Sequence, residues 1–110
     1  MRPDSQDIRL ALSIRQPHAE LILRGEKTTE VRSRPTRVRE RIYIYTPQKW
    51  DDIPDHLPPD LDIGVIVGSV EIVGCIRDGN LWHWLLSAPA RLEKPIEPTK
   101  RPQPVYFKPF

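Results

Sequence analysis

The alternation of apolar and polar residues along the chain predicts a protein built mainly from short β-strands. Apolar or β-branched runs of strand length occur at residues 10–14, 28–32, 41–45, 64–76 and 105–107. In the third run, Ile42 and Ile44 should face one side of a sheet, and the two tyrosines of the run should face the other. The last run is expected to add an edge strand.

Two short helices are expected between these strands. The first begins at Pro17, carries its apolar stripe over residues 19–23, and ends where Gly25 can adopt the left-handed conformation. The chain should reverse sharply after this glycine. Asn80 can cap a second helix over residues 81–86, which a proline would stop. The two tryptophans of that helix would then plug one end of a barrel.

The elements together indicate a mixed α+β class, mainly β, in which the strands form a small closed or nearly closed β-barrel with two short helices. Gly68 and Gly74 would let the longest strand bulge or bend around that barrel. We expect residues 1–9 to form a loosely ordered arm and residues 10–110 to form one domain. Residues 46–63 contain four prolines and five aspartates, so they should form a surface excursion without a chemical role.

The positive charge of the chain is concentrated in its first half. Residues 1–49 hold 11 Lys or Arg and six Asp or Glu, whereas residues 50–110 hold six and nine. Seven of the cations lie between Arg24 and Arg41, which favours a polyanion as the binding partner. A solvated loop without a ligand would have the same composition.

Several other classes of protein receive little support from the sequence. No apolar stretch of about 18 residues occurs, so we expect no membrane association. Cys75 is the single cysteine and cannot form an internal disulfide. The three histidines, His18, His56 and His83, are scattered without ligand spacing, so we expect neither a metal nor a cofactor. A cytoplasmic location is the default expectation.

The candidate site lies in the segment GEKTTEVR at residues 25–32. Because side chains alternate along a strand, Glu30 and Arg32 should share one face, and Lys27 can lean over the same side from the preceding turn. The end of the first predicted strand should deliver three more polar residues nearby, namely Ser13, Arg15 and Gln16.

The three ionisable residues of this segment suit a polar ligand. Lys27 supplies a compact cation for a phosphate or a carbonyl, and Arg32 supplies a planar fork for a phosphate or a base edge. Glu30 could orient either cation or accept a hydrogen bond from an exocyclic amine. A surface ion-pair cluster without a ligand would use the same three residues.

The spacing GxKxxExR at residues 25–32 resembles the signature of the ASCH domain family. Residues 12–17 and the later segments GVIVGSVEIVGC and LWHWLLSAPARLEKP are also similar to that family, so the resemblance spans residues 10–96. It implies a PUA-like β-barrel with a cleft between the first helix and the barrel, which binds RNA or a modified nucleoside. His18 replaces the aromatic residue that often follows the proline in this family.

We therefore expect a domain that binds RNA or a nucleotide-like ligand. The residues predicted to line or flank its site are Ser13, Arg15, Gln16, Lys27, Glu30, Arg32, Arg34, Arg37, Arg39, Arg41 and Tyr45. The choice between RNA and DNA stays open at this point.

Two alternatives also stay open. The first is a small hydrolase acting on an acylated nucleoside or on RNA, with Lys27, Glu30 and Glu71 as its catalytic groups. The relatives that cleave acylated cytidine carry a hydroxyl residue in place of Glu30, and Thr29 lies on the opposite strand face, which argues against a threonine nucleophile. The second alternative is a protein-interaction module whose basic loop docks an acidic partner.

Overall fold

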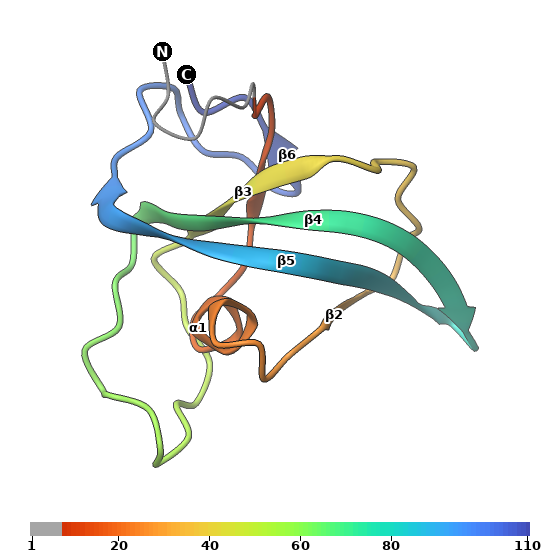
Figure 1. Ribbon diagram of the computed structural model, residues 1–110, viewed down its shortest axis with the longest axis horizontal. Helices are drawn as coiled ribbons and strands as arrows, with labels where there is room; N and C mark the ends of the chain where they lie inside the picture. The colour runs from red at the N-terminus through yellow and green to blue at the C-terminus, as the bar shows by residue number, and fades with distance from the viewer. Residues whose placement is uncertain (1–7) are drawn as a thin grey trace.

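Six strands form one sheet in the computed structural model, which describes residues 8–110 (Figure 1). The strands are β1 (Ala11–Ser13), β2 (Thr29–Arg32), β3 (Arg41–Thr46), β4 (Val65–Asp78), β5 (Leu81–Ile96) and β6 (Tyr106–Phe107). Their order across the sheet is β2-β5-β4-β3-β1-β6. Neighbouring strands are antiparallel, except for the parallel pair of β1 and β3. The mainly β class is confirmed.

The sheet does not close, so the predicted barrel is not confirmed. β2 and β6 are the two edges, and no strand pairing joins them within residues 8–110. These edge strands have only four and two residues, and each pairs on one side. Hydrophobic alternation identifies which residues can form strands, but it does not determine whether the first and last strands meet. Side chains and a cavity lie between the two edges.

The helix predicted at residues 81–86 is wrong, because these residues form the beginning of β5 (Figure 1). Asp78 pairs with Leu81, which leaves Gly79 and Asn80 as a two-residue hairpin loop between β4 and β5. Gly79 has a φ of 63°, as the first central residue of a type II′ hairpin turn requires. Pairing of the two long strands thus overrides the local helical pattern.

The β4–β5 hairpin is irregular at the glycines that the sequence singled out. The pairing register shifts between Ile66 and Gly68 and between Ile72 and Gly74, and a further shift lies between Ser69 and Glu71. The bulges predicted at Gly68 and Gly74 are therefore confirmed. They bend the long hairpin across the molecule (Figure 1).

Both faces of the sheet are buried around β3, and its residues divide between the faces as the alternating sequence predicted. Ile42 and Ile44 lie in a cluster that also contains Ile22 of the helix described next. Tyr43 and Tyr45 lie in a second cluster on the other face. Each fully buried isoleucine contributes about 1.5–3 kcal/mol through loss of apolar surface from water. The centre of the sheet is therefore the most strongly held part of the fold.

The predicted N-terminal arm lies mostly outside the described residues, and its boundary at residue 10 stays a prediction. Ile8 is buried in the second cluster. Arg9 Nη2 lies 2.6 Å from Glu40 Oε1 in an ion pair. These two residues of the predicted arm therefore contact the body of the domain.

The helix α1 (His18–Leu23) is the single α-helix of the described residues, and its end agrees with the prediction. Gly25 N donates to Ile22 O at 3.0 Å, and Glu26 N donates to Leu21 O at 2.9 Å. This pair of bonds is the Schellman motif, which needs a residue with positive φ, and Gly25 has a φ of 78°. The chain reverses here and runs into β2.

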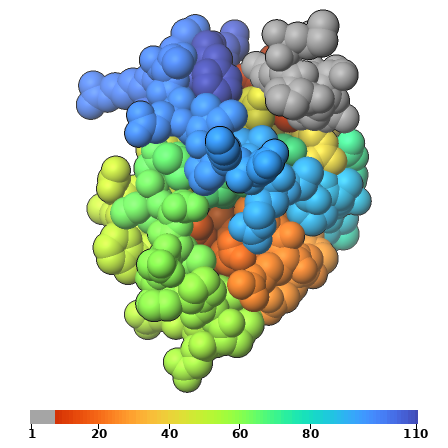
Figure 2. Space-filling model, turned by 60° about the vertical axis from the view of Figure 1, so that its left-hand side comes forward, coloured from red at the N-terminus to blue at the C-terminus, as the bar shows by residue number. Residues whose placement is uncertain are grey.

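A buried carboxylate fastens α1 to β5. Glu20 is 7% exposed, and both its oxygens accept hydrogen bonds from Arg91 at 2.9 Å, while Arg24 Nε donates to Oε2 at 2.7 Å. Burial alone would raise the pKa of Glu20, but the hydrogen bonds from Arg91 and Arg24 outweigh it and lower that pKa. Figure 2 shows the hollow above this contact, framed by the green segment after β3 and the blue of β5.

Replacing Gly25 with alanine should destabilise the protein by about 1 kcal/mol, since a left-handed conformation costs a residue with a Cβ about 1–2 kcal/mol. A Cβ at this position would meet no atom within 4 Å, so the cost is conformational and not steric. Urea unfolding measures the change. Gly25→Asn should cost less, because asparagine tolerates positive φ. An alanine variant as stable as the parent protein would contradict this account of the helix end.

Glu20→Gln should lower the unfolding free energy at pH 7 by about 1–2 kcal/mol, because hydrogen bonds to charged groups contribute about 1.5–3 kcal/mol and Arg91 is half exposed. The folded-state pKa is lowered, so the stabilisation is present above the ordinary value of 4.5 and is lost as the pH falls through the lowered value. The difference in unfolding free energy between variant and parent, measured by urea unfolding, should therefore become smaller towards pH 3.

The exposed Glu93 provides the control for this experiment, because it makes no ion pair with any described residue. Glu93→Gln should change the unfolding free energy little at pH 7 or at pH 3. A gap between Glu20→Gln and the parent that stays constant from pH 7 to pH 3 would show that Glu20 does not stabilise the fold through its charge.

Candidate functional site between the sheet edges

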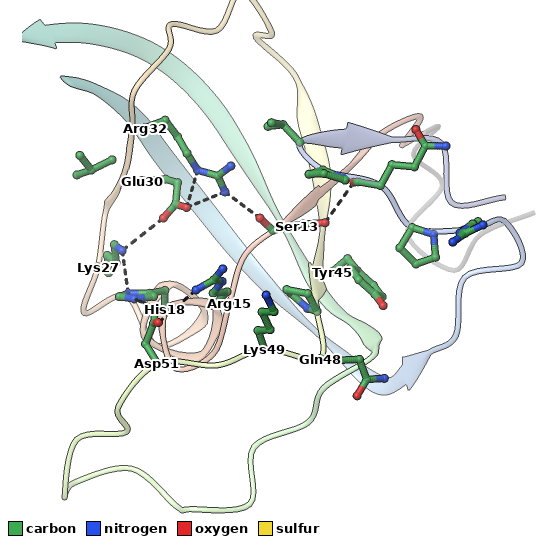
Figure 3. A pocket seen from close by; sticks show the side chains of 17 residues that line it. Ser13, Arg15, His18, Lys27, Glu30, Arg32, Tyr45, Gln48, Lys49 and Asp51 are labelled. Atoms are coloured by element: carbon green, nitrogen blue, oxygen red, sulfur yellow. Dashed lines mark hydrogen bonds and ion pairs between the residues drawn. The ribbon is translucent and has the colours of Figure 1, made fainter. Parts of the chain in front are cut away.

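A cavity of about 880 Å³ lies between the two edges of the open sheet (Figure 3). One wall is β2, from Glu30 to Arg32, and the opposite wall is the segment 101–105 that leads into β6. Ser13 at the end of β1 and Tyr45 near the end of β3 also line it. The failure of the sheet to close therefore creates the cavity.

The three ionisable residues of the sequence motif lie together on the β2 wall. Glu30 and Arg32 are two residues apart on β2, so their side chains share one face, and Arg32 Nε donates to Glu30 Oε2 at 2.9 Å. The turn after α1 brings Lys27 Nζ to 3.4 Å from Glu30 Oε1. Glu30 is 8% exposed, so its buried charge must be compensated by the two cations, Lys27 and Arg32. The expected convergence of the three side chains is observed.

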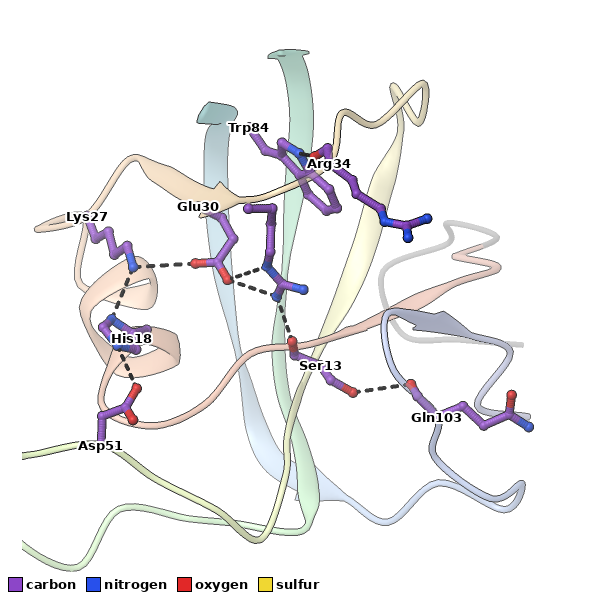
Figure 4. A network of polar contacts seen from close by, with 9 residues as sticks. Ser13, His18, Lys27, Glu30, Arg34, Asp51, Trp84 and Gln103 are labelled. Atoms are coloured by element: carbon purple, nitrogen blue, oxygen red, sulfur yellow. Dashed lines mark hydrogen bonds and ion pairs between the residues drawn. The ribbon is translucent and has the colours of Figure 1, made fainter. Parts of the chain in front are cut away.

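Side chains bridge the opening where backbone pairing is absent (Figure 4). Arg32 Nη2 donates to the backbone oxygen of Ser13 at 2.8 Å, which links β2 to β1. The Ser13 hydroxyl donates to Gln103 O at 3.4 Å, while a backbone bond from Ser13 N to Val105 O at 3.2 Å extends the pairing of β1 with β6. A continuous polar chain thus runs from Glu30 to the segment before β6.

Aromatic packing fixes the orientation of Arg32. The guanidinium carbon lies 5.4 Å from the centre of the Trp84 ring, and Trp84 stacks on Tyr106 of β6 with ring centres 5.7 Å apart. Trp84 is 2% exposed and donates from Nε1 to Arg34 O at 2.9 Å, so it belongs to the core. Burial raises the pKa of Tyr106, whose hydroxyl contacts Thr36 Oγ1 at 2.7 Å. The stack therefore sets the separation of the two edges.

The polar chain continues from Lys27 in the other direction. Lys27 Nζ lies 3.0 Å from His18 Nδ1, and His18 Nε2 lies 3.0 Å from Asp51 Oδ2. Asp51 reaches this place because its backbone N donates to Gln16 O at 2.8 Å, which anchors the loop after β3 beside α1. The side chains of the helix, the turn and the loop meet at this end of the cavity.

His18 and Asp51 were not among the predicted site residues. Residues 46–63 were expected to have no chemical role, yet Asp51, Gln48 and Lys49 of this segment line the cavity. The chain reversal after Gly25 could have indicated His18, since it returns Lys27 towards the helix. No local pattern in the sequence identifies the loop residues, because a hydrogen bond to Gln16 sets their position.

Tyr45 and Arg15 are predicted site residues that line the cavity. Tyr45 is buried, its ring meets Phe107 edge-on at 5.4 Å, and burial raises the pKa of its hydroxyl. Arg15 is exposed, with Nη1 3.6 Å from Asp51 Oδ1. Lys49 and Arg101 are further cavity cations that the sequence analysis did not select.

Gln16 lies outside this cavity, and its side chain binds the backbone of two other segments. Its side chain is buried, its Oε1 accepts from Glu20 N at 3.0 Å, and its Nε2 donates to Asp62 O at 3.1 Å. Gln16 therefore joins the beginning of α1 to the end of the loop. It lines the smaller hollow seen in Figure 2.

The four arginines of the basic loop also lie outside the cavity, namely Arg34, Arg37, Arg39 and Arg41. Arg39 donates to two neighbouring backbone oxygens, those of Thr36 and Val38. Arg41 donates to Ser69 Oγ at 2.8 Å and to Ala88 O at 2.7 Å. Arg34, Arg37 and Arg39 are exposed, and Arg34 and Arg37 make no side-chain hydrogen bond with the described residues, so these two are the least constrained part of a wider electrostatic surface.

Glu71 is separate from the motif. It lies on β4 opposite Arg41 and Ser87 and is absent from the cavity lining. Neither oxygen forms an ion pair within the described part of the chain. The structure does not bring Glu71 to Lys27 and Glu30.

The described residues contain no group of three or more His, Cys, Asp or Glu that could hold a metal ion. None of their helices is long and apolar enough to span a membrane. The cavity itself is lined by five cations, Arg15, Lys27, Arg32, Lys49 and Arg101, against the two carboxylates of Glu30 and Asp51. Its lining therefore favours an anionic or acceptor-rich ligand.

His18 should occupy a single neutral tautomer in this arrangement. The Lys27 ammonium has only donors, so Nδ1 of His18 must accept and Nε2 must carry the proton that goes to Asp51. Imidazole ¹⁵N shifts measured by NMR on the neutral ring should show a protonated Nε2 and a bare Nδ1. Asp51→Asn should weaken this preference. Protonation at Nδ1 in the parent protein would contradict the contact with the lysine ammonium.

The sequence profile of the ASCH domain family matches residues 12–106. The fold is similar to the crystal structure of ASCH from Zymomonas mobilis, with a TM-score of 0.65, 16% identity, and coverage of 90% of this chain and 85% of that chain. The sequence has no significant match among curated proteins.

Two mutants of the Zymomonas mobilis protein give similar comparisons. A tyrosine-to-phenylalanine mutant has a TM-score of 0.65 at 16% identity, with coverage of 90% of this chain and 88% of that chain. A serine-to-alanine mutant has a TM-score of 0.60 at 14% identity, with coverage of 90% and 86%. These identities show a common fold and no more. Because the profile match extends over most of the sequence, this chain belongs to the ASCH domain family.

Proposed function

We propose that this ASCH domain binds RNA or a nucleotide-like ligand in the cavity between β2 and the segment before β6. The family has a PUA-like fold and is generally associated with nucleic acids. The observation that carries the proposal is the cluster of Lys27, Glu30 and Arg32 on one cavity wall. Its donors are held in place before any ligand arrives, which lowers the cost of ordering them on binding.

The cluster presents hydrogen-bond donors to the cavity. An ammonium has three protons, and Lys27 directs its contacts to His18 and Glu30, which leaves one donor for a ligand. Arg32 uses Nε and Nη2 for Glu30 and Ser13, so Nη1 is available. A carbonyl or ring nitrogen of an exposed base can accept from such groups. Both donors come from rigid positions, which favours selective recognition.

The cavity volume favours an unpaired nucleotide over a duplex. About 880 Å³ lies within the range of 300–1,000 Å³ that holds a drug-sized molecule. Base edges can be read in single strands, where the bases are not covered by their neighbours. The exposed Arg34 and Arg37 lie outside the cavity and would add electrostatic attraction to a strand that extends beyond it.

The hydrolase alternative has less support from the same geometry. Both oxygens of Glu30 are in contact with a cation, and Glu71 is absent from the cavity. Neither carboxylate is therefore poised beside Lys27 as an uncommitted general base. Binding without turnover is the function that we propose.

The test is binding of short single-stranded RNA at low salt, measured by fluorescence anisotropy. Arg32→Gln and Lys27→Met should each weaken binding about tenfold or more, because hydrogen bonds from charged groups contribute about 1.5–3 kcal/mol. Affinity should fall with added salt, with a slope of about 0.7 for each phosphate contact in a single strand. Undetectable binding at low salt would defeat the proposal.

Arg37→Gln is the matched control, since this arginine is exposed and makes no hydrogen bond with the described residues. It should change affinity by about threefold at most, as expected for an exposed charge. Circular dichroism and thermal unfolding would verify that each variant is folded. Loss of binding in Arg37→Gln with unchanged binding in Arg32→Gln would favour docking through the basic loop.

A further inference from the structure

We infer that the cavity contains a phosphate subsite formed by Arg15, Lys49 and Arg101, separate from the motif cluster, and that its ligand is a phosphate-bearing nucleotide and not a free nucleoside. This inference rests on the proposed function. It assigns the charged part of the ligand to residues outside the GxKxxExR motif. The motif would then contact an uncharged polar part, such as a base edge.

The motif cations are already engaged with protein groups. Lys27 is in contact with Glu30 and His18, and Arg32 is in contact with Glu30 and Ser13. A phosphate placed against them would approach the buried carboxylate of Glu30, and like charges repel strongly where water is excluded. The cluster therefore suits a neutral acceptor better than a dianion.

The other cavity cations are less neutralised. Lys49 and Arg101 are exposed and have no ion-pair partner within residues 8–110. Arg15 has one acidic neighbour, Asp51, with Nη1 and Oδ1 3.6 Å apart, and the same carboxylate lies 3.0 Å from His18. Free guanidinium and ammonium groups on one cavity are the usual ligands of phosphate.

The sheet topology brings these three residues to one end of the fold. β1 and β3 are parallel, with Ser13 opposite Tyr45, so the segments after them, which carry Arg15 and Lys49, leave the sheet at the same end. β6 is antiparallel to β1, with Tyr106 opposite Leu12, so the segment before it begins at that end too. Arg101 lies in that segment. The three cations therefore line one cavity from the same end of the sheet because of strand order and not because of sequence proximity.

The geometry separates the two parts of the ligand. Figure 3 shows Lys27, Glu30 and Arg32 along the β2 wall, while Arg15 lies next to His18 and Lys49 lies between Arg15 and Tyr45. A nucleotide can extend from one group to the other, with its base towards β2 and its phosphate towards Arg15 and Lys49. A free nucleoside would leave the second group unoccupied.

The experiment compares each of the four ribonucleosides with its 5′-monophosphate and with dinucleoside monophosphates, by NMR titration of the parent protein. The phosphate-bearing ligands should bind about tenfold tighter or better than the nucleoside, since a charged hydrogen bond is worth at least that factor. If only the monophosphate binds more tightly than the nucleoside, the subsite holds a terminal phosphate. If the monophosphate and the dinucleoside monophosphate both bind more tightly than the nucleoside, the subsite holds phosphates in general, including those within a strand.

Variants then show which cavity residues cause the tighter binding of the nucleotide. In Arg15→Gln/Lys49→Gln the ratio of nucleotide to nucleoside affinity should fall towards one, whereas Lys27→Met should weaken both ligands together and preserve the ratio. Lys94→Gln, at an exposed position on β5 away from the cavity, should leave the ratio unchanged. Thermal unfolding would show that the double variant is folded.

Three results would overturn the inference. Equal affinity for nucleoside and nucleotide would remove the phosphate subsite and leave the proposed function intact. A phosphate gain that survives in the double variant but disappears in Lys27→Met would place the phosphate at the motif. No binding of any of these compounds or of single-stranded RNA would reject both the subsite and the proposed function.

Discussion

The fold depends on a row of side-chain contacts that holds the two edges of an open sheet at a fixed separation. Backbone pairing ends at β2 on one side and at β6 on the other. Between them, Glu30 holds Arg32, Arg32 binds the backbone of Ser13, and Trp84 stacks on Tyr106. A buried carboxylate without its cations would be costly, so these contacts constrain one another. The cavity exists because side chains, and not backbone hydrogen bonds, complete the sheet.

Local features of the structure could be predicted from the sequence where local chemistry determines them. The alternation in β3 fixed which residues face each side, and Gly25 marked the end of α1. The spacing of Glu30 and Arg32 placed them on one face because strand side chains alternate. Each of these predictions uses residues within a few positions of one another, where backbone geometry leaves little choice.

Features set by distant contacts could not be predicted in this way. Residues 81–86 have an apolar pattern compatible with a helix, but pairing with β4 makes them part of a strand. The loop after β3 carries Asp51 and Lys49 into the cavity through an anchor on Gln16, which lies 35 positions away along the chain from Asp51. Arg101 arrives through the pairing of β6 with β1. Nothing near these residues in the sequence indicates such neighbours, so the sequence predicted the convergence of the motif side chains but not the cavity residues around them.

The Glu30 cluster is the part of the molecule that we propose a ligand contacts. The most direct measurement is the side-chain ¹H–¹⁵N signal of Arg32 Nε, followed by NMR while a short single-stranded RNA is added. We expect this signal and the backbone amides of β2 to shift together and to saturate with the bound fraction. Signals of β2 and Arg32 that stay in place while those of residues 33–40 or the β4–β5 hairpin shift would contradict the account.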